Sequence, residues 1–194
     1  MSEPEIVDTA VPTTRRRGTQ LVAIAVGVVL VALIWVLVSA SPNSSENADS
    51  PLLGQPSPAI ETTTLDNQQF NLARRKGSWV ILNFFNSTCV PCINEHPLLL
   101  AFVRTEAIAQ NPAELYTVVN DDSDDSVAAF FRKNGGNWPK LRDANGSIAI
   151  SFGIAKVPET WIIDPNGYVR LRIVGQLSNG LLDEQLVALK ASFG

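Results

Sequence analysis

Apolar residues form runs of two different lengths along the chain. The run at 21–40, LVAIAVGVVLVALIWVLVSA, contains no charged residue. A helix of about twenty such residues spans about 30 Å, which is the thickness of the apolar core of a bilayer. The shorter runs at 79–85 (WVILNFF) and 115–120 (LYTVVN) are typical of strands that are buried on both faces of a sheet. The chain is therefore predicted to have one transmembrane anchor, residues 21–40, and a separate globular core.

Charges on either side of the long run predict the orientation of the anchor. Three arginines at 15–17 precede it, whereas Glu46 and Asp49 follow it. Because basic residues stay on the cytoplasmic side, residues 1–20 are expected to form a cytoplasmic tail and the rest of the chain to lie outside. A cleavable secretory signal ending at the small residues 38–40 is the alternative, but the apolar part of a signal has only about 7–15 residues. Both interpretations place the globular part outside the cytoplasm.

The pattern after residue 40 predicts a tether followed by one α/β domain. Residues 41–58 are rich in Ser, Pro and Asn, which is typical of a flexible tether, so the domain is expected to cover 59–194. Its order is β-α-β-α and then β-β-α, which predicts a mixed sheet with helices on both faces. Further predicted elements are a hairpin around 66–67, helices over 123–136 and 181–192, a strand at 159–164 and an alternating antiparallel strand at 168–175.

Composition narrows the choice of function. The 194 residues carry a net charge of −4 with a pI near 5.0, which gives no electrostatic reason to expect a nucleic-acid partner. Both cysteines and the single histidine lie in one stretch, NSTCVPCINEHP, at 86–97. Two cysteines are too few for a disulfide scaffold, and an exported pair tends to be oxidised unless another protein reduces it.

A metal site, a structural disulfide and a redox pair compete for this stretch. A structural zinc site needs four ligands, and Cys89, Cys92 and His96 supply three. Covalent haem needs a histidine directly after the second cysteine, where Ile93 stands. A purely structural disulfide over so short a loop contributes only about 2 kcal/mol. We therefore expect no metal and no cofactor other than a redox-active disulfide.

Redox exchange also fits the expected local structure. A helix that begins at the cysteines, capped by Ser87 or Thr88, would favour the Cys89 thiolate through its N-terminal dipole. Cys89 is then the attacking nucleophile, and Cys92, one turn deeper, resolves the mixed disulfide. Pro91 stiffens the loop between the two cysteines.

The same stretch resembles a known superfamily. VILNFFNSTCVPCINEHP is similar to the active-site strand and helix of thioredoxin-like proteins, and Pro97 matches the proline that kinks that helix. Within that superfamily, the sequences CxxCxxEH and FGIAKVPETWIIDPNG, together with the anchor and tether, resemble the membrane-anchored reductases of cytochrome c maturation (TlpA-, ResA- and CcmG-like). The likeness covers about residues 56–192 and implies a thioredoxin-like fold with an N-terminal hairpin extension.

The resemblance also implies roles for individual residues. Glu95, three residues after Cys92 and on the same helix face, would exchange a proton with Cys92, although by itself it could be a solvated helix acid. Pro158 is expected to be cis, which exposes the Val157 backbone to an incoming peptide. Glu159 either lies near the redox pair or only pairs at the start of a strand.

Two positions depart from the usual family pattern, and they bear on client contacts and on proton transfer. Thr88 stands where the family usually has a tryptophan, so client contacts at Thr88, Val90 and Pro91 are expected to differ. Asn83 replaces the buried aspartate of thioredoxin itself, which shifts proton transfer to Glu95. Asn83 and His96 are otherwise expected to be packed, hydrogen-bonded residues.

The resemblance implies an extracytoplasmic, single-pass membrane enzyme that reduces disulfides in exported proteins. Apocytochrome c is the expected client, a transmembrane protein the expected electron donor, and a monomer the expected state. A disulfide-introducing oxidase has the same motif, and Val90-Pro91 does not decide the direction. A peroxiredoxin-type peroxidase shares the fold, but Leu82 and Asn86 occupy the places of its framing proline and hydroxyl residue. A peptide-binding module without turnover is the remaining alternative.

Overall fold

The computed structural model describes residues 16–39 and 46–193, and it describes side chains at 21–35 and 47–193. This part of the chain divides into two units: the helix α1, and everything from strand β1 onward. Residues 1–15 and 40–45, which hold most of the predicted tail and the first part of the predicted tether, lie outside the described residues.

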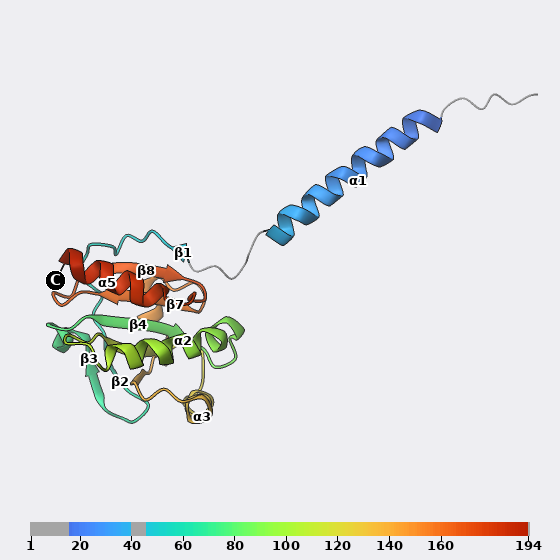
Figure 1. Cartoon of the computed structure of the whole chain (residues 1–194). Helices are drawn as coiled ribbons and strands as arrows, with labels where there is room; N and C mark the ends of the chain where they lie inside the picture. The colour runs from blue at the N-terminus through green and yellow to red at the C-terminus, as the bar shows by residue number, and fades with distance from the viewer. Residues whose placement is uncertain (1–15, 40–45, 194) are drawn as a thin grey trace, which may run out of the picture. The chain divides into compact units, whose positions relative to one another are not determined.

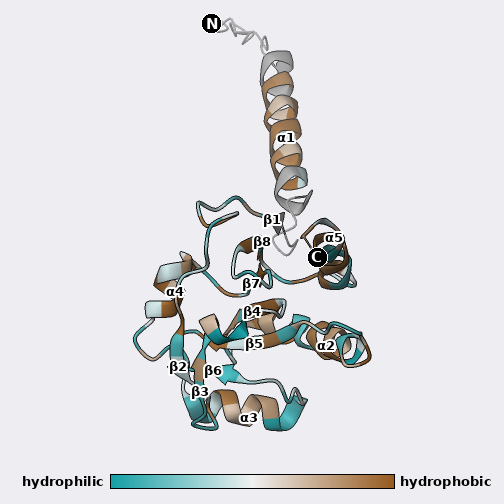
Figure 2. Ribbon diagram, turned by 90° about the vertical axis from the view of Figure 1, so that its left-hand side faces the viewer, coloured by the Kyte–Doolittle hydropathy of each residue, from teal (hydrophilic) through white to brown (hydrophobic). Residues whose placement is uncertain are grey.

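Helix α1 covers Arg16–Ser39. Every side chain described on it, at 21–35, is exposed, and Figure 2 shows these residues in the colours of apolar side chains. Within the described residues, no helix combines the length and apolar content that crossing a membrane requires.

The second unit is built on a six-stranded mixed sheet with the order β1-β8-β7-β4-β5-β6. Figure 1 labels the strands from β1 to β4 of this order, and Figure 2 labels all six. Strand β4 pairs in parallel with β5, and β5 with β6, whereas β7, β8 and β1 add antiparallel neighbours on the other side of β4. All six residues of β4 are buried, as the unbroken apolar run predicted. The strands are Glu46–Asn47 (β1), Val80–Phe85 (β4), Glu114–Val119 (β5), Lys140–Leu141 (β6), Glu159–Ile163 (β7) and Val169–Val174 (β8).

Each face of the sheet has its own hydrophobic core. Three helices, α2 (Val90–Glu106), α3 (Asp124–Asn134) and α5 (Leu181–Phe193), pack on one face around Phe85, Phe102 and Leu186. The opposite face holds the short helix α4, the 3-10 helix η1 and the β2–β3 hairpin around Phe84, Phe152 and Trp161. Figure 2 shows α2 and α4 on opposite sides of the sheet. The predicted thioredoxin-like α/β fold with a hairpin extension is confirmed. The remaining bounds are Glu61–Thr63 (β2), Gln69–Asn71 (β3), Leu72–Arg75 (η1) and Ser147–Phe152 (α4).

The described part of the predicted tether is packed, so that part of the prediction is wrong. Asn47 of β1 pairs with Ile173 of β8, and the Gly54 N–H donates to the Val169 carbonyl at 2.8 Å. Leu52 and Leu53 pack against the core under α4. The physical reason is the free edge of β8, whose unpaired backbone groups are satisfied by an added strand whatever its side chains.

Candidate active site

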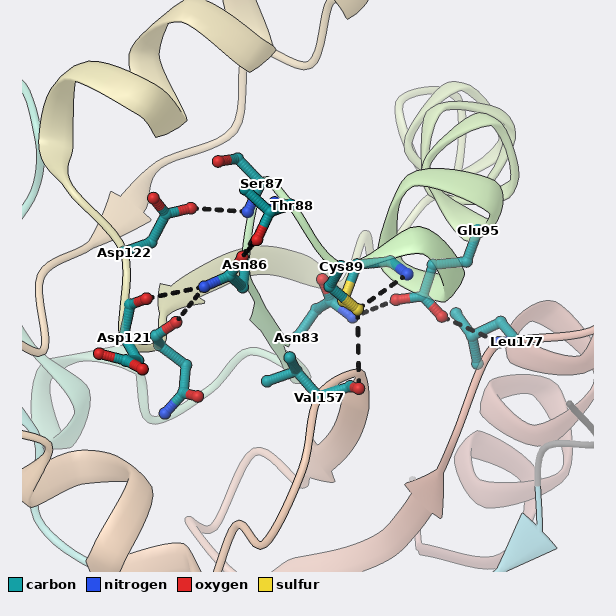
Figure 3. The surroundings of a disulfide bond; sticks show 12 residues. Asn83, Asn86, Ser87, Thr88, Cys89, Glu95, Asp121, Asp122, Val157 and Leu177 are labelled. Atoms are coloured by element: carbon teal, nitrogen blue, oxygen red, sulfur yellow. Dashed lines mark hydrogen bonds between the residues drawn. A yellow bond between two sulfur atoms is a disulfide. The ribbon is translucent and has the colours of Figure 1, made fainter. Parts of the chain in front are cut away.

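The two cysteines lie where β4 gives way to α2, and a disulfide joins them (Figure 3). Cys89 is half-buried, whereas Cys92 is completely buried under the first turn of α2. The pair therefore has one sulfur within reach of another protein and one that is shielded. That is the arrangement expected of an attacking and a resolving cysteine.

Helix α2 is capped by Cys89 itself, so the predicted cap at Ser87 or Thr88 is wrong. The Cys89 sulfur lies 3.3 Å from the Cys92 N–H, in the position of a capping acceptor. Thr88 instead donates from both its N–H and its hydroxyl to the Asn86 side-chain oxygen, at 2.9 and 2.7 Å. These bonds draw Thr88 back toward the end of β4, one residue too early to cap.

The loop before the cysteines is tied to the loop that follows β5. The Asn86 amide donates to the backbone carbonyls of Asn120 and Asp121, at 3.1 and 2.7 Å. The Asp122 carboxylate accepts from the Ser87 N–H at 2.6 Å. Sequence reasoning did not give Asn86 this role. In the sequence, Asn86 was compared only with the peroxidase motif. An asparagine between a strand and a helix also indicates a side chain that can bind backbone groups in a turn.

The Val157–Pro158 peptide bond is cis, as predicted. The Val157 carbonyl oxygen lies 3.6 Å from the Cys89 sulfur (Figure 3). A disulfide sulfur carries no hydrogen, so this is a close contact in the oxidised protein, and a thiol there would have an acceptor in reach. The structure therefore brings Cys89 and the predicted peptide-binding backbone together.

Glu95 is completely buried, so the solvated helix acid considered as its alternative is wrong. One carboxylate oxygen accepts from the Asn83 amide at 2.8 Å, and the other accepts from the Leu177 N–H at 2.9 Å. Burial raises the pKa of Glu95 to about 7, and these two bonds offset only part of that rise. A carboxyl group with such a pKa gains and loses a proton near neutral pH, which suits a proton carrier.

Asn83 is also completely buried, as expected. Its Nδ2 group donates to Glu95 and lies 3.1 Å from the Thr160 hydroxyl on the neighbouring strand β7. Leu177 completes this environment from the loop between β8 and α5. Sequence reasoning missed Leu177 because a backbone donor leaves no mark in the side-chain pattern.

Glu159 does not join this group. It is buried, and its two oxygens accept from Arg172 of β8 at 2.9 and 3.0 Å. Neighbouring side chains on a strand point to opposite faces, so Glu159 lies on the other face of the sheet from Thr160, which contacts Asn83. Of the two roles considered for Glu159, the structure supports pairing at the start of a strand.

His96 packs locally, as expected. Its Nε2 atom lies 3.1 Å from the Gly135 carbonyl oxygen, and its ring contacts those of Phe130, Phe131 and Trp138. Burial lowers the pKa of His96, which favours a neutral ring. Across the described residues, no group of three or more His, Cys, Asp and Glu side chains is placed to hold a metal ion.

Comparison with known proteins places this site in a family. The model of the AhpC/TSA family matches residues 53–172, which is more than half of the chain. The chain belongs to the AhpC/TSA family. Within it, the chain is similar to the thiol:disulfide interchange protein DsbE homolog of Paracoccus denitrificans, with 31% identity over 81% of this chain and 87% of the relative.

Other relatives carry related names. Thiol:disulfide interchange protein DsbE of Escherichia coli is 29% identical over 81% of this chain and 85% of its own. A thioredoxin-family thiol:disulfide interchange protein of Chlorobium tepidum superposes with a TM-score of 0.62 and 25% identity, over 73% of this chain and 98% of its own. With its disulfide between Cys89 and Cys92, this member of the AhpC/TSA family is a thiol:disulfide oxidoreductase of the DsbE/ResA type.

Proposed function

We propose that the protein is a membrane-anchored, extracytoplasmic disulfide reductase, and that apocytochrome c is its client. The observation that carries this proposal is the pairing of an accessible Cys89, beside the Val157 carbonyl, with a buried Cys92 one turn before the buried Glu95. Similarity to DsbE and ResA proteins supports the same reading.

Reduction would proceed in two exchanges. In the reduced protein, the Cys89 thiolate attacks one sulfur of the client disulfide. A disulfide forms between Cys89 and the client while the client S–S bond breaks, and the other client sulfur leaves as a thiolate. The N-terminus of α2 favours the Cys89 thiolate, because the free N–H groups of this helix end point toward the sulfur. The Val157 backbone would hold the client segment beside Cys89 as an added strand.

The second exchange releases the client. Glu95 takes the proton of the Cys92 thiol, and the Cys92 thiolate attacks the Cys89 sulfur, which closes the disulfide and expels the second client sulfur. Two electrons have then passed to the client. Its two thiolates take up the proton held by Glu95 and the one that Cys89 released earlier through solvent. A transmembrane donor of reducing equivalents would have to restore both thiols.

The anchor at 21–40 remains a proposal. It is supported by the uncharged sequence of that segment, by the three preceding arginines, and by the exposed apolar side chains described at 21–35 of α1. The side chains at 36–40 lie outside the described residues. Fractionation of cells into soluble and membrane proteins, before and after replacement of 21–40 by a cleavable signal, tests the anchor.

Trapping of a client tests the two exchanges. Cys92→Ser removes the resolving thiol, so a mixed disulfide between Cys89 and the client should accumulate and should dissolve on addition of dithiothreitol. Cys89→Ser is the matched control, because it keeps one thiol in the same motif but buries it. If the two variants yield the same covalent products, or neither yields any, the two-step exchange is wrong.

A further inference from the structure

Asn83 has an unexplained polar atom beside the proposed proton carrier. Both hydrogens of its Nδ2 group are directed to acceptors, Glu95 Oε1 at 2.8 Å and Thr160 Oγ1 at 3.1 Å. Its Oδ1 atom is buried and has no hydrogen-bond partner among the described residues. A buried amide oxygen without a donor is unfavourable and uncommon. An asparagine in this position therefore needs a functional explanation.

Protonation of Glu95 would create a conflict with the Asn83 amide. Glu95 Oε2 accepts from the Leu177 N–H, and a backbone N–H is a donor only. The proton of the neutral acid therefore belongs on Oε1, the atom that faces Asn83. With Nδ2 in its place, two donors would then point at each other across 2.8 Å.

Reversing the amide removes this conflict. The two ends of an asparagine side chain have nearly the same shape, so Oδ1 fits where Nδ2 now lies. From there it accepts from the protonated Glu95. The Thr160 hydroxyl, which is both a donor and an acceptor, changes from accepting to donating. The contacts with Glu95 and Thr160 are then satisfied without movement of the backbone, and the Nδ2 group takes the place of Oδ1, where no described residue is a partner in either state.

We propose that Asn83 and Thr160 are a reversible donor–acceptor pair for Glu95, which donates to the carboxylate, accepts from the carboxylic acid, and reverses the Asn83 amide between the two states. Asn83 and Thr160 are positioning residues. They keep the carboxyl group in one place on α2 while its proton passes to and from Cys92. The proposal rests on the proposed function in one respect: the transfer of a proton between Glu95 and Cys92 belongs to the proposed disulfide exchange.

Other ionisable groups near the helix do not account for a switch at this corner. Cys92, on the same helix, does not titrate while the disulfide is closed. The His96 ring is bound to the Gly135 carbonyl among aromatic rings, and Glu159 is paired with Arg172 on the opposite face of the sheet. Within the described residues, no ion pair involves Glu95. Its pKa of about 7 means that both states are populated near neutral pH.

Nuclear magnetic resonance on the oxidised full-length protein tests the pair directly. The Glu95 carboxyl carbon and the two Asn83 amide hydrogens are followed from about pH 5 to about pH 9, a range that brackets the Glu95 pKa. We expect the Asn83 hydrogens to shift with the same midpoint as the Glu95 carbon. We also expect them to lose their proximity to the Thr160 methyl group on the acidic side.

Two variants separate Glu95 from other titrating groups. Glu95→Gln should abolish the titration of the Asn83 hydrogens. Glu106→Gln should leave it intact, because Glu106 is another buried glutamate of α2 but bonds Ala113 and Lys190 instead. The wild-type titration stands by itself if either variant fails to fold.

The pair is refuted if Glu95 titrates while the Asn83 hydrogens keep their shifts and their proximity to Thr160. It is also refuted if Glu95 does not titrate in this range. Neither result depends on disulfide exchange, so a failure of the pair is distinguishable from a failure of the proposed function, which the trapping experiment measures.

Discussion

Burial of Glu95 should make the domain less stable as the pH rises. The pKa of Glu95 rises from an ordinary 4.5 to about 7 on folding. Below the lower value the group is neutral in both states and contributes no difference. Between the two values only the unfolded chain releases the proton, so the free energy of unfolding falls with increasing pH. Above about pH 7 the loss is constant, and at 1.36 kcal/mol for each pH unit it amounts to about 3 kcal/mol.

Glu95→Gln tests this reasoning because glutamine stays neutral at every pH. The side-chain oxygen of the glutamine accepts from the Leu177 N–H in place of the carboxylate. The NH2 group of the glutamine donates to Asn83 Oδ1 after the Asn83 amide is reversed. We expect the variant to match the wild type near pH 4 and to exceed it by about 3 kcal/mol near pH 8. Urea unfolding of the oxidised full-length protein, followed by fluorescence of the buried tryptophans, gives both values.

A control variant shows whether glutamine itself is tolerated on this helix. Glu106→Gln should lower stability near pH 8, because it removes the negative charge of the ion pair with Lys190, although the glutamine oxygen can still accept from the Ala113 N–H. A stability difference between Glu95→Gln and the wild type that stays constant from about pH 4 to about pH 8 would refute the linkage. Destabilisation by Glu95→Gln near pH 8 would refute it as well.

Two further substitutions test the packing around the site. Arg172→Leu leaves the buried Glu159 carboxylate unpaired and should lower the free energy of unfolding by about 3–5 kcal/mol. The double variant Arg172→Leu with Glu159→Gln should regain part of this loss. Equal losses of stability in the single and the double variant would show that the unpaired carboxylate is not the cause. Thr117→Val removes the acceptor, at 2.9 Å, of the Trp138 indole N–H and should lower stability by about 1–3 kcal/mol. Thr105→Val, at an exposed position of α2, is its control and should change little.

Sequence reasoning predicted the fold well because long-range order here follows local patterns. The unbroken apolar run became β4, and the helix predicted over 123–136 formed as α3, with Ser123 as its N-cap. Helix α4 was missed because it has only six residues and its N-terminus has no side-chain cap. Strand β1 was missed because the edge of β8, and not the composition of the tether, determines where it pairs.

The site was predicted less completely, for a related reason. The spacing correctly placed Cys92 and Glu95 on one helix that begins directly after Cys89, but it could not show that Glu95 is buried. Its environment comes from Asn83 of β4 and from the backbone of Leu177, which lies 82 positions away. Glu159 was open between two roles because its partner Arg172 belongs to an alternating strand, whose charged residues were expected to face water. The structure instead half-buries them.

The reduction potential of the Cys89–Cys92 disulfide, titrated in the full-length protein against a dithiothreitol buffer, decides the direction of electron flow. A reductase that is recharged by a transmembrane donor should have a potential near or below that of thioredoxin, about −270 mV. A value near about −120 mV, as in a strong oxidant, would contradict the proposed reductase. The fold and the disulfide exchange would stand, but the protein would introduce disulfides into its clients.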